Sequence, residues 1–113
     1  MVRFLKPDIN TSQDLSSAVL SYTTSIAKAF KLDQIIIKAS VNITETITIT
    51  LISAKGTNYN AVLRKRSLSA EQNFVYKPEG GSNYQAGDEI KVECTKANST
   101  GTVYLTIKTS EIS

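Results

Sequence analysis

Apolar and polar side chains alternate along much of the chain, most clearly in the window VNITETITITLI, residues 41–52. One face of an extended chain here would carry Ile43, Ile47, Ile49 and Leu51, and the other face Thr44, Thr46, Thr48 and Thr50. A helix would scatter these residues around its axis, whereas a strand alternates its side chains between two faces, so the window predicts a half-buried strand. An apolar strand face needs cover, and the pattern therefore also predicts a second sheet packed on the first.

Further strands are predicted from β-branched runs and from the same alternation. The run Ile35, Ile36, Ile37 inside residues 32–41 predicts a central strand that is covered on both faces. Residues 59–68, 73–77, 89–95 and 102–109 also read as strands, the last with Val103, Leu105 and Ile107 inward and Tyr104 outward. Between them we expect a turn at 53–60, a flexible glycine-rich loop at 79–87 and a hairpin loop at 96–101.

Residues 14–30 fit two structures. As a helix, with Ser12 as a cap, the segment would align apolar side chains from Leu15 to Phe30 along one face. As a strand, it would alternate from Ala18 to Ile26, and the four serines and threonines at its centre are poor helix formers. The strand is the favoured interpretation.

Residues 1–13 read as an N-terminal arm that precedes a domain spanning residues 14–113. The arm contains a small apolar patch, VRFL, with Phe4 and Leu5, followed by Pro7 and polar residues. Such an arm either docks on a neighbouring subunit or forms an edge strand or frayed end on its own domain. Both alternatives stay open at this point.

Seven to eight short strands, joined by Gly, Asn and Ser turns, define the predicted fold class. This is the pattern of an all-β protein with two antiparallel sheets, either jelly-roll-like or immunoglobulin-like. The chain lacks the Cys-Trp-Cys framework of antibody domains, because it has one cysteine and no tryptophan. We therefore expect a jelly-roll-like sandwich.

Composition then limits the function. A chain of 113 residues corresponds to one domain, which buries roughly 65% of its unfolded surface. No apolar run reaches the length of about 18 residues that a membrane span needs, so no membrane contact is expected. The net charge of +3 is spread along the chain, and aromatic residues make up only 7%, so a base-stacking surface for nucleic acid is not expected either.

Reactive groups are scarce. The chain has no histidine, which removes the base of a Ser-His-Asp or Cys-His pair and the commonest metal ligand. Cys94 lies in phase with Ile90 and Val92 and is expected to be an inert core thiol. Asp88 and Glu89 could join a calcium site, but the default interpretation of Asp88 is a turn-forming residue. We expect no enzymatic activity, no cofactor, no metal and no small-molecule ligand.

Several short motifs follow one another along the chain: a Lys-Leu-Asp step at 31–33, Thr-Glu-Thr at 44–46, a Gly-x-Asn-Tyr turn at 56–59, an aromatic segment ending in Pro78, and Ala-Gly-Asp-Glu-Ile at 86–90. In this order they resemble small accessory virion proteins of tailed bacteriophages. The resemblance covers nearly everything from Ser16 onward. It implies a non-enzymatic structural part of the virion, either a capsid decoration or cement protein or a tail protein. It transfers no catalytic residue.

These inferences predict a structural module located in the virion, which forms homo-oligomers and binds capsid or tail subunits. Contacts are expected through sheet surface, edge strands and the arm. The candidate contact residues are Phe4, Leu5, Tyr59, Arg64, Arg66, Tyr76, Tyr84 and Tyr104. The basic run Arg64-Lys65-Arg66 is expected to be split between the two faces of its strand.

The alternative is a carbohydrate- or receptor-binding sandwich, such as a tail-associated adhesin. Such a module would stack a sugar on Tyr84 or Tyr104, with Asn58, Asn60 or Asn83 nearby.

Overall fold

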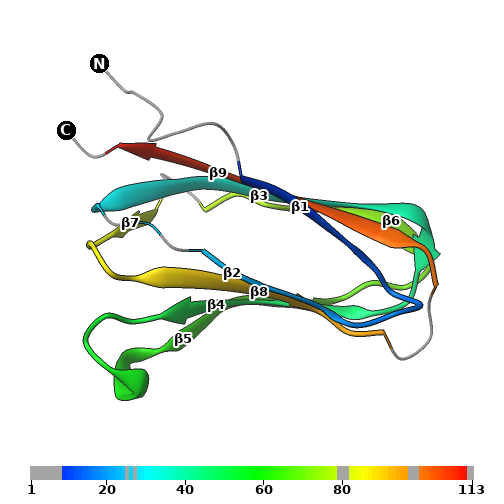
Figure 1. The fold of residues 1–113 in the computed structure, drawn as a ribbon, viewed down its shortest axis with the longest axis horizontal. Helices are drawn as coiled ribbons and strands as arrows, with labels where there is room; N and C mark the ends of the chain where they lie inside the picture. Colours follow the sequence, from blue (N-terminus) through cyan, green and yellow to red (C-terminus); the bar gives the residue numbers. More distant parts are fainter. Residues whose placement is uncertain (1–8, 25, 27, 79–81, 97–99, 112–113) are drawn as a thin grey trace.

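The computed structural model describes residues 9–24, 26, 28–78, 82–96 and 100–111, and they form two antiparallel sheets that lie one above the other (Figure 1). The first sheet runs in the order β1 (Ile9–Asp14), β9 (Thr102–Glu111), β3 (Phe30–Ile43) and β6 (Glu71–Tyr76), with β7 (Ser82–Tyr84) also beside β3. The second runs in the order β2 (Leu20–Thr23), β8 (Glu89–Cys94), β4 (Thr46–Ile52) and β5 (Ala61–Ser67). The predicted two-sheet sandwich is confirmed.

Strand pairing is nested along the chain. β4 pairs with β5, β3 with β6, β2 with β8 and β1 with β9, always antiparallel. The chain is thus a long antiparallel ribbon that is rolled into two layers, which is the jelly-roll arrangement. β7 is an addition between β6 and β8, and it brings the described strands to nine, compared with the seven to eight expected.

The core is the apolar layer between the sheets. Its largest fully buried side chains are Leu15, Phe30, Leu32, Ile35, Ile37, Ile43, Ile47, Ile49, Ile90, Val92, Leu105 and Ile107. Most of them follow the period-two pattern of their strands, as predicted for residues 89–95 and 102–109. Each buried aliphatic side chain of this size contributes about 1.5–3 kcal/mol to folding.

β3 is central, as predicted, because it pairs with β9 on one side and with β6 and β7 on the other. Its cover differs from the prediction. Ile35 and Ile37 are buried against the second sheet, whereas Ile36 is only half-buried on the outer face. The run of isoleucines therefore marks a central strand with one open face.

The prediction of a single strand over 41–52 is wrong. β3 ends at Ile43 in the first sheet, and β4 begins at Thr46 in the second. Glu45 between them is buried, and its carboxylate accepts a hydrogen bond of 2.7 Å from Thr95 Oγ1. Alternation continues through the corner, because Ile43 and Ile47 both face the core from different sheets. A change of sheet therefore leaves no trace in the pattern.

Residues 14–30 contain no helix in their described part. β2 covers only Leu20–Thr23, and the preceding turn begins at Asp14, whose carboxylate accepts the N–H of Ser16 at 2.9 Å. A hydrogen bond from the Ser16 hydroxyl, together with this backbone hydrogen bond, lowers the pKa of Asp14. The favoured strand is therefore present but short.

The first part of the chain and two loops also differ in detail from the expectations. Residues 9–14 form edge strand β1, which corresponds to the second alternative for the N-terminal segment. The loop expected at 79–87 contains β7, whose Tyr84 pairs with Phe30. β8 and β9 do not form the hairpin expected around residues 96–101, because they lie in different sheets; residues 97–99 themselves lie outside the described part of the chain. Such pairings depend on residues far apart in sequence.

No helix in the described residues is long and apolar enough to cross a membrane.

Candidate functional site

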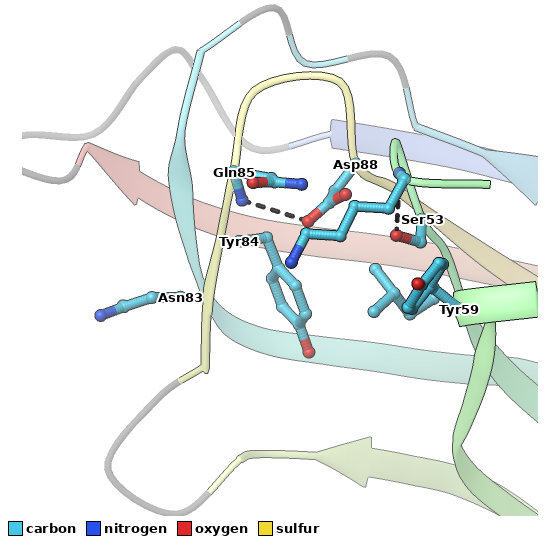
Figure 2. Close-up of a pocket in the computed structure, with 8 residues that line it drawn as sticks. Ser53, Tyr59, Asn83, Tyr84, Gln85 and Asp88 are labelled. Atoms are coloured by element: carbon cyan, nitrogen blue, oxygen red, sulfur yellow. Dashed lines mark hydrogen bonds between the residues drawn. The ribbon is translucent and has the colours of Figure 1, made fainter.

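A hollow of about 440 Å³ opens at the end of the sandwich where β4 ends and β8 begins (Figure 2). The antiparallel pairing of β4 with β8 places Ile52 opposite Glu89, so the loop after β4 and the turn before β8 are neighbours. The hollow, called here the tyrosine hollow, is lined by Leu51, Ser53, Lys55, Tyr59, Asn83, Tyr84, Gln85 and Asp88.

Asp88 ties the two walls of the tyrosine hollow together. Its side chain is 6% exposed, and one carboxylate oxygen accepts the N–H of Ala54 at 2.8 Å. The other oxygen accepts the N–H of Gln85 at 3.1 Å (Figure 2). Asp88 thus forms a turn, as expected, and in addition links that turn to the loop after β4.

Two predicted contact residues meet at the tyrosine hollow. Tyr59 belongs to the short 3-10 helix η1 (Thr57–Tyr59) and is 63% exposed. Tyr84 of β7 is half-buried, with its ring 5.5 Å from that of Phe30, centroid to centroid. In Figure 2 the two tyrosines stand on opposite sides of the hollow, and Asn83 extends away from them.

The other candidate amides are placed differently. Asn60 Oδ1 accepts the N–H of Ser53 at 2.7 Å and so fixes the loop itself. Asn58 is exposed and does not line the hollow.

Arg64 and Arg66 lie on β5, the edge strand of the second sheet. They stand opposite Ile49 and Ile47, so they share the inner face of β4, while Lys65 stands opposite Thr48 on the outer face. The basic run is therefore split between faces, as predicted. Its one ion pair joins Arg66 to Glu71 at 3.1 Å, within the described part of the chain.

Tyr104 lies far from the tyrosine hollow, on the outer face of the first sheet. It is 52% exposed and stands between Ser12 of β1 and Lys38 of β3. Val75 on β6 and Ile36 on β3 add apolar surface to the same face. Tyr104 points outward, as predicted.

Tyr76 and the arm complete the candidate set. Tyr76 at the end of β6 pairs with Ile35 and packs, half-buried, against the core. Phe4 and Leu5 lie outside the described residues. The six candidates that the structure describes thus fall on separate surfaces. Arg64 and Arg66 share β5, Tyr76 and Tyr104 lie on the first sheet, and Tyr59 and Tyr84 line the tyrosine hollow.

Lys55 and Gln85 line the tyrosine hollow but were not among the sequence candidates. Their signal was indirect, since Lys55 precedes Gly56 in a predicted turn and Gln85 lies two residues before Gly87 in a predicted loop. Only the pairing of β4 with β8 shows that these two turns are neighbours.

Cys94 is buried in β8 and behaves as a core residue, as predicted. Burial, and to a lesser extent the nearby Glu45 carboxylate, raises the pKa of its thiol to about 11. Among the described residues, no three His, Cys, Asp or Glu side chains gather closely enough to hold a metal ion.

We expect Cys94 to react slowly with a thiol-specific disulfide reagent at pH 8 in the folded protein. With a pKa of about 11, roughly one thiol in a thousand is ionised, and only the thiolate attacks. Unfolding in urea should speed the reaction at least about a hundredfold by restoring the ordinary pKa. Labelling of Cys94 in the folded protein within seconds would contradict the expected slow reaction.

The raised pKa of Cys94 also means that the free energy of unfolding falls as the pH rises from about 9 towards 11.

The comparisons with known proteins give fold-level likeness only. No protein-family model matches the chain, and no curated protein matches it. The chain is similar to the core of a Drosophila protein, NLP, over 90% of this chain and 96% of the NLP chain, with 12% identity and a TM-score of 0.45. The crystal structure of the NLP core concerns pentamer formation and histone binding by that protein.

Two viral structures are also similar. Chains of infectious bursal disease virus, strains Gt and Gx, cover 97% of this chain with 12% and 14% identity and TM-scores of 0.39 and 0.37. The likeness spans 30% of each viral chain. At this level of similarity, none of these proteins indicates a function for the chain.

Proposed function

We propose that the chain is a non-enzymatic structural subunit of a virus particle, an accessory protein of a tailed bacteriophage that binds other virion subunits. A decoration or cement role on the capsid is the first choice, with the tail as the second location. The virion assignment is supported by the motif order from Ser16 onward. The protein-binding part is supported by one observation, the exposed free edge of β5.

β5 presents an open edge along its length. It has seven residues, of which only Leu63 is half-buried, and Val62 is 61% exposed. It pairs with β4 on one side, and no described strand pairs with its other side. A row of unpaired backbone groups is a template for a strand from another chain.

Hydrogen-bond alternation shows which residues of β5 offer these backbone groups. The N–H of Leu68 donates to the carbonyl of Glu45 at 2.8 Å, which makes these two residues a hydrogen-bonded pair. Such pairs alternate with non-bonded pairs along an antiparallel ladder. Counting back from Leu68, Arg66 directs its backbone groups towards β4, whereas Ser67 and Lys65 direct theirs towards the free edge.

The hydrogen bonding between β4 and β8 agrees with this alternation. Thr46 accepts the N–H of Thr95 at 3.1 Å, so the backbone of Thr46 faces β8. Thr46 is the partner of Ser67, whose backbone groups therefore have no bonding partner in β4.

Charge indicates the kind of strand that would bind. Arg64, Lys65 and Arg66 follow one another along the edge and are all exposed. Two copies of β5 paired with each other would bring these cations together, which is unfavourable. The partner strand is therefore one with acidic side chains on a different protein, and the predicted homo-oligomer contacts would lie elsewhere on the molecule.

Lys65→Pro tests the proposal with little expected effect on the fold. Proline removes an N–H that points to the free edge, and edge strands tolerate it. The wild-type chain should cosediment with purified particles from its source, and recombinant chain should rebind to particles stripped of it. Lys65→Pro should rebind at least about tenfold more weakly.

Lys65→Ala is the matched control, because it removes the charge and keeps the N–H. It should rebind within about fivefold of the wild type, because a single exposed ion pair with an acidic partner contributes at most about 1 kcal/mol. Absence of the chain from purified particles would refute the virion role. Equal rebinding of Lys65→Pro and wild type would refute the role of the β5 edge.

A further inference from the structure

We infer that the tyrosine hollow binds a neutral saccharide, with a pyranose ring held between Tyr59 and Tyr84. This is a second binding activity. It is carried by the loop after β4 and the turn before β8, and not by the β5 edge.

The walls of the hollow are held in place before any ligand arrives. Asp88 links the two walls through its bonds to Ala54 and Gln85. Within the loop after β4, Asn60 holds Ser53, and the Ser53 hydroxyl accepts the N–H of Lys55 at 3.1 Å. A site that is already ordered loses less entropy on binding, which favours weak ligands such as sugars.

The lining has the two kinds of surface that a pyranose needs. Sugar rings carry an apolar C–H face, and aromatic side chains offer the matching flat surface. Tyr59 is exposed, Tyr84 is backed by Phe30, and Leu51 adds apolar surface. Lys55 and Gln85 are exposed at the rim, where their ammonium and amide groups can bond to hydroxyls.

Electrostatics favours a neutral ligand over a nucleotide or another phosphate. A phosphate would need backbone N–H groups or several cations. The N–H groups of Ala54 and Gln85 are already bound to the Asp88 carboxylate, and Lys55 is the one cation that lines the described hollow. The volume, about 440 Å³, lies in the range of ligand pockets and would hold one or two sugar rings.

An NMR titration tests the inference directly. The ¹⁵N-labelled chain is titrated with glucose, galactose, N-acetylglucosamine, maltose, cellobiose, lactose and diacetylchitobiose, and with AMP in a separate arm. We expect at least one sugar to give saturable shifts of the Lys55, Tyr59 and Tyr84 amides, with a dissociation constant in the millimolar range or below.

Tyr59→Ala should weaken that binding about tenfold or more, and it should fold normally because Tyr59 is an exposed loop residue. Tyr104→Ala removes an exposed tyrosine from the other sheet and should bind like the wild type. The inference fails if no sugar in the panel gives saturable shifts at the hollow. It also fails if AMP alone binds there, or if Tyr59→Ala binds as well as the wild type.

Discussion

Replacing Ile49 by alanine is expected to lower the free energy of unfolding by about 3 kcal/mol, within the range of 2–5 kcal/mol typical of such changes. Ile49 is fully buried in β4, between Val92 of β8 and the edge strand. Truncation removes apolar contacts and leaves a cavity in a close-packed layer. Urea denaturation followed by circular dichroism measures the loss, with the m-value expected to stay unchanged.

Thr48→Ala is the matched control for this prediction, because Thr48 is the neighbour on the other face of β4 and is only half-buried. It should change the free energy of unfolding by less than about 1 kcal/mol. Similar losses for both variants would mean that the two faces of β4 are equally buried, which the sandwich does not allow.

Asp88→Ala should cost about 3 kcal/mol of stability for a different reason. The change leaves the N–H groups of Ala54 and Gln85, which are partly buried, without the acceptor that the buried Asp88 side chain provides. Each hydrogen bond to a charged group is worth about 1.5–3 kcal/mol. Thermal unfolding of the two proteins at pH 7 measures the difference.

Asp88→Asn keeps one acceptor oxygen and should lose about half as much stability. Glu89→Ala, which removes the adjacent carboxylate, should stay within about 0.5 kcal/mol of the wild type. Because Asp88 links the two walls of the tyrosine hollow, Asp88→Ala should also weaken sugar binding. If it is as stable as Glu89→Ala, the two hydrogen bonds do not hold the walls.

The sequence predicted those features of the fold that depend on neighbouring residues. Ile47 and Ile49 are buried while Thr48 is not, and Cys94 follows Val92 into the core, because side-chain direction in a strand is a local property. The outward position of Tyr104 follows for the same reason.

Features that depend on pairing between distant segments could not be predicted. The corner at Glu45 preserves the alternation, so the passage from one sheet to the other leaves no mark in the pattern. β7 forms because Tyr84 pairs with Phe30, more than fifty residues earlier. Until that pairing is known, the loop looks unstructured.

The candidate site was predicted by residue type and not by location. Tyr59 and Tyr84 were chosen for their chemistry, but only the pairing of β4 with β8 brings their loops together. For Lys65, one property could be predicted from the sequence and another could not. Its charge was visible in the sequence, whereas the direction of its backbone N–H depends on the register of β5 against β4.

Amide hydrogen exchange of β5, measured on the free chain and on the chain in its native particle, tests the central claim that this edge receives a partner strand. In the free chain, the amides of Lys65 and Ser67 should exchange quickly, while those of Arg64 and Arg66 are protected by β4. Binding should protect Lys65 and Ser67 as well. Fast exchange at both positions in the assembled particle would contradict the account.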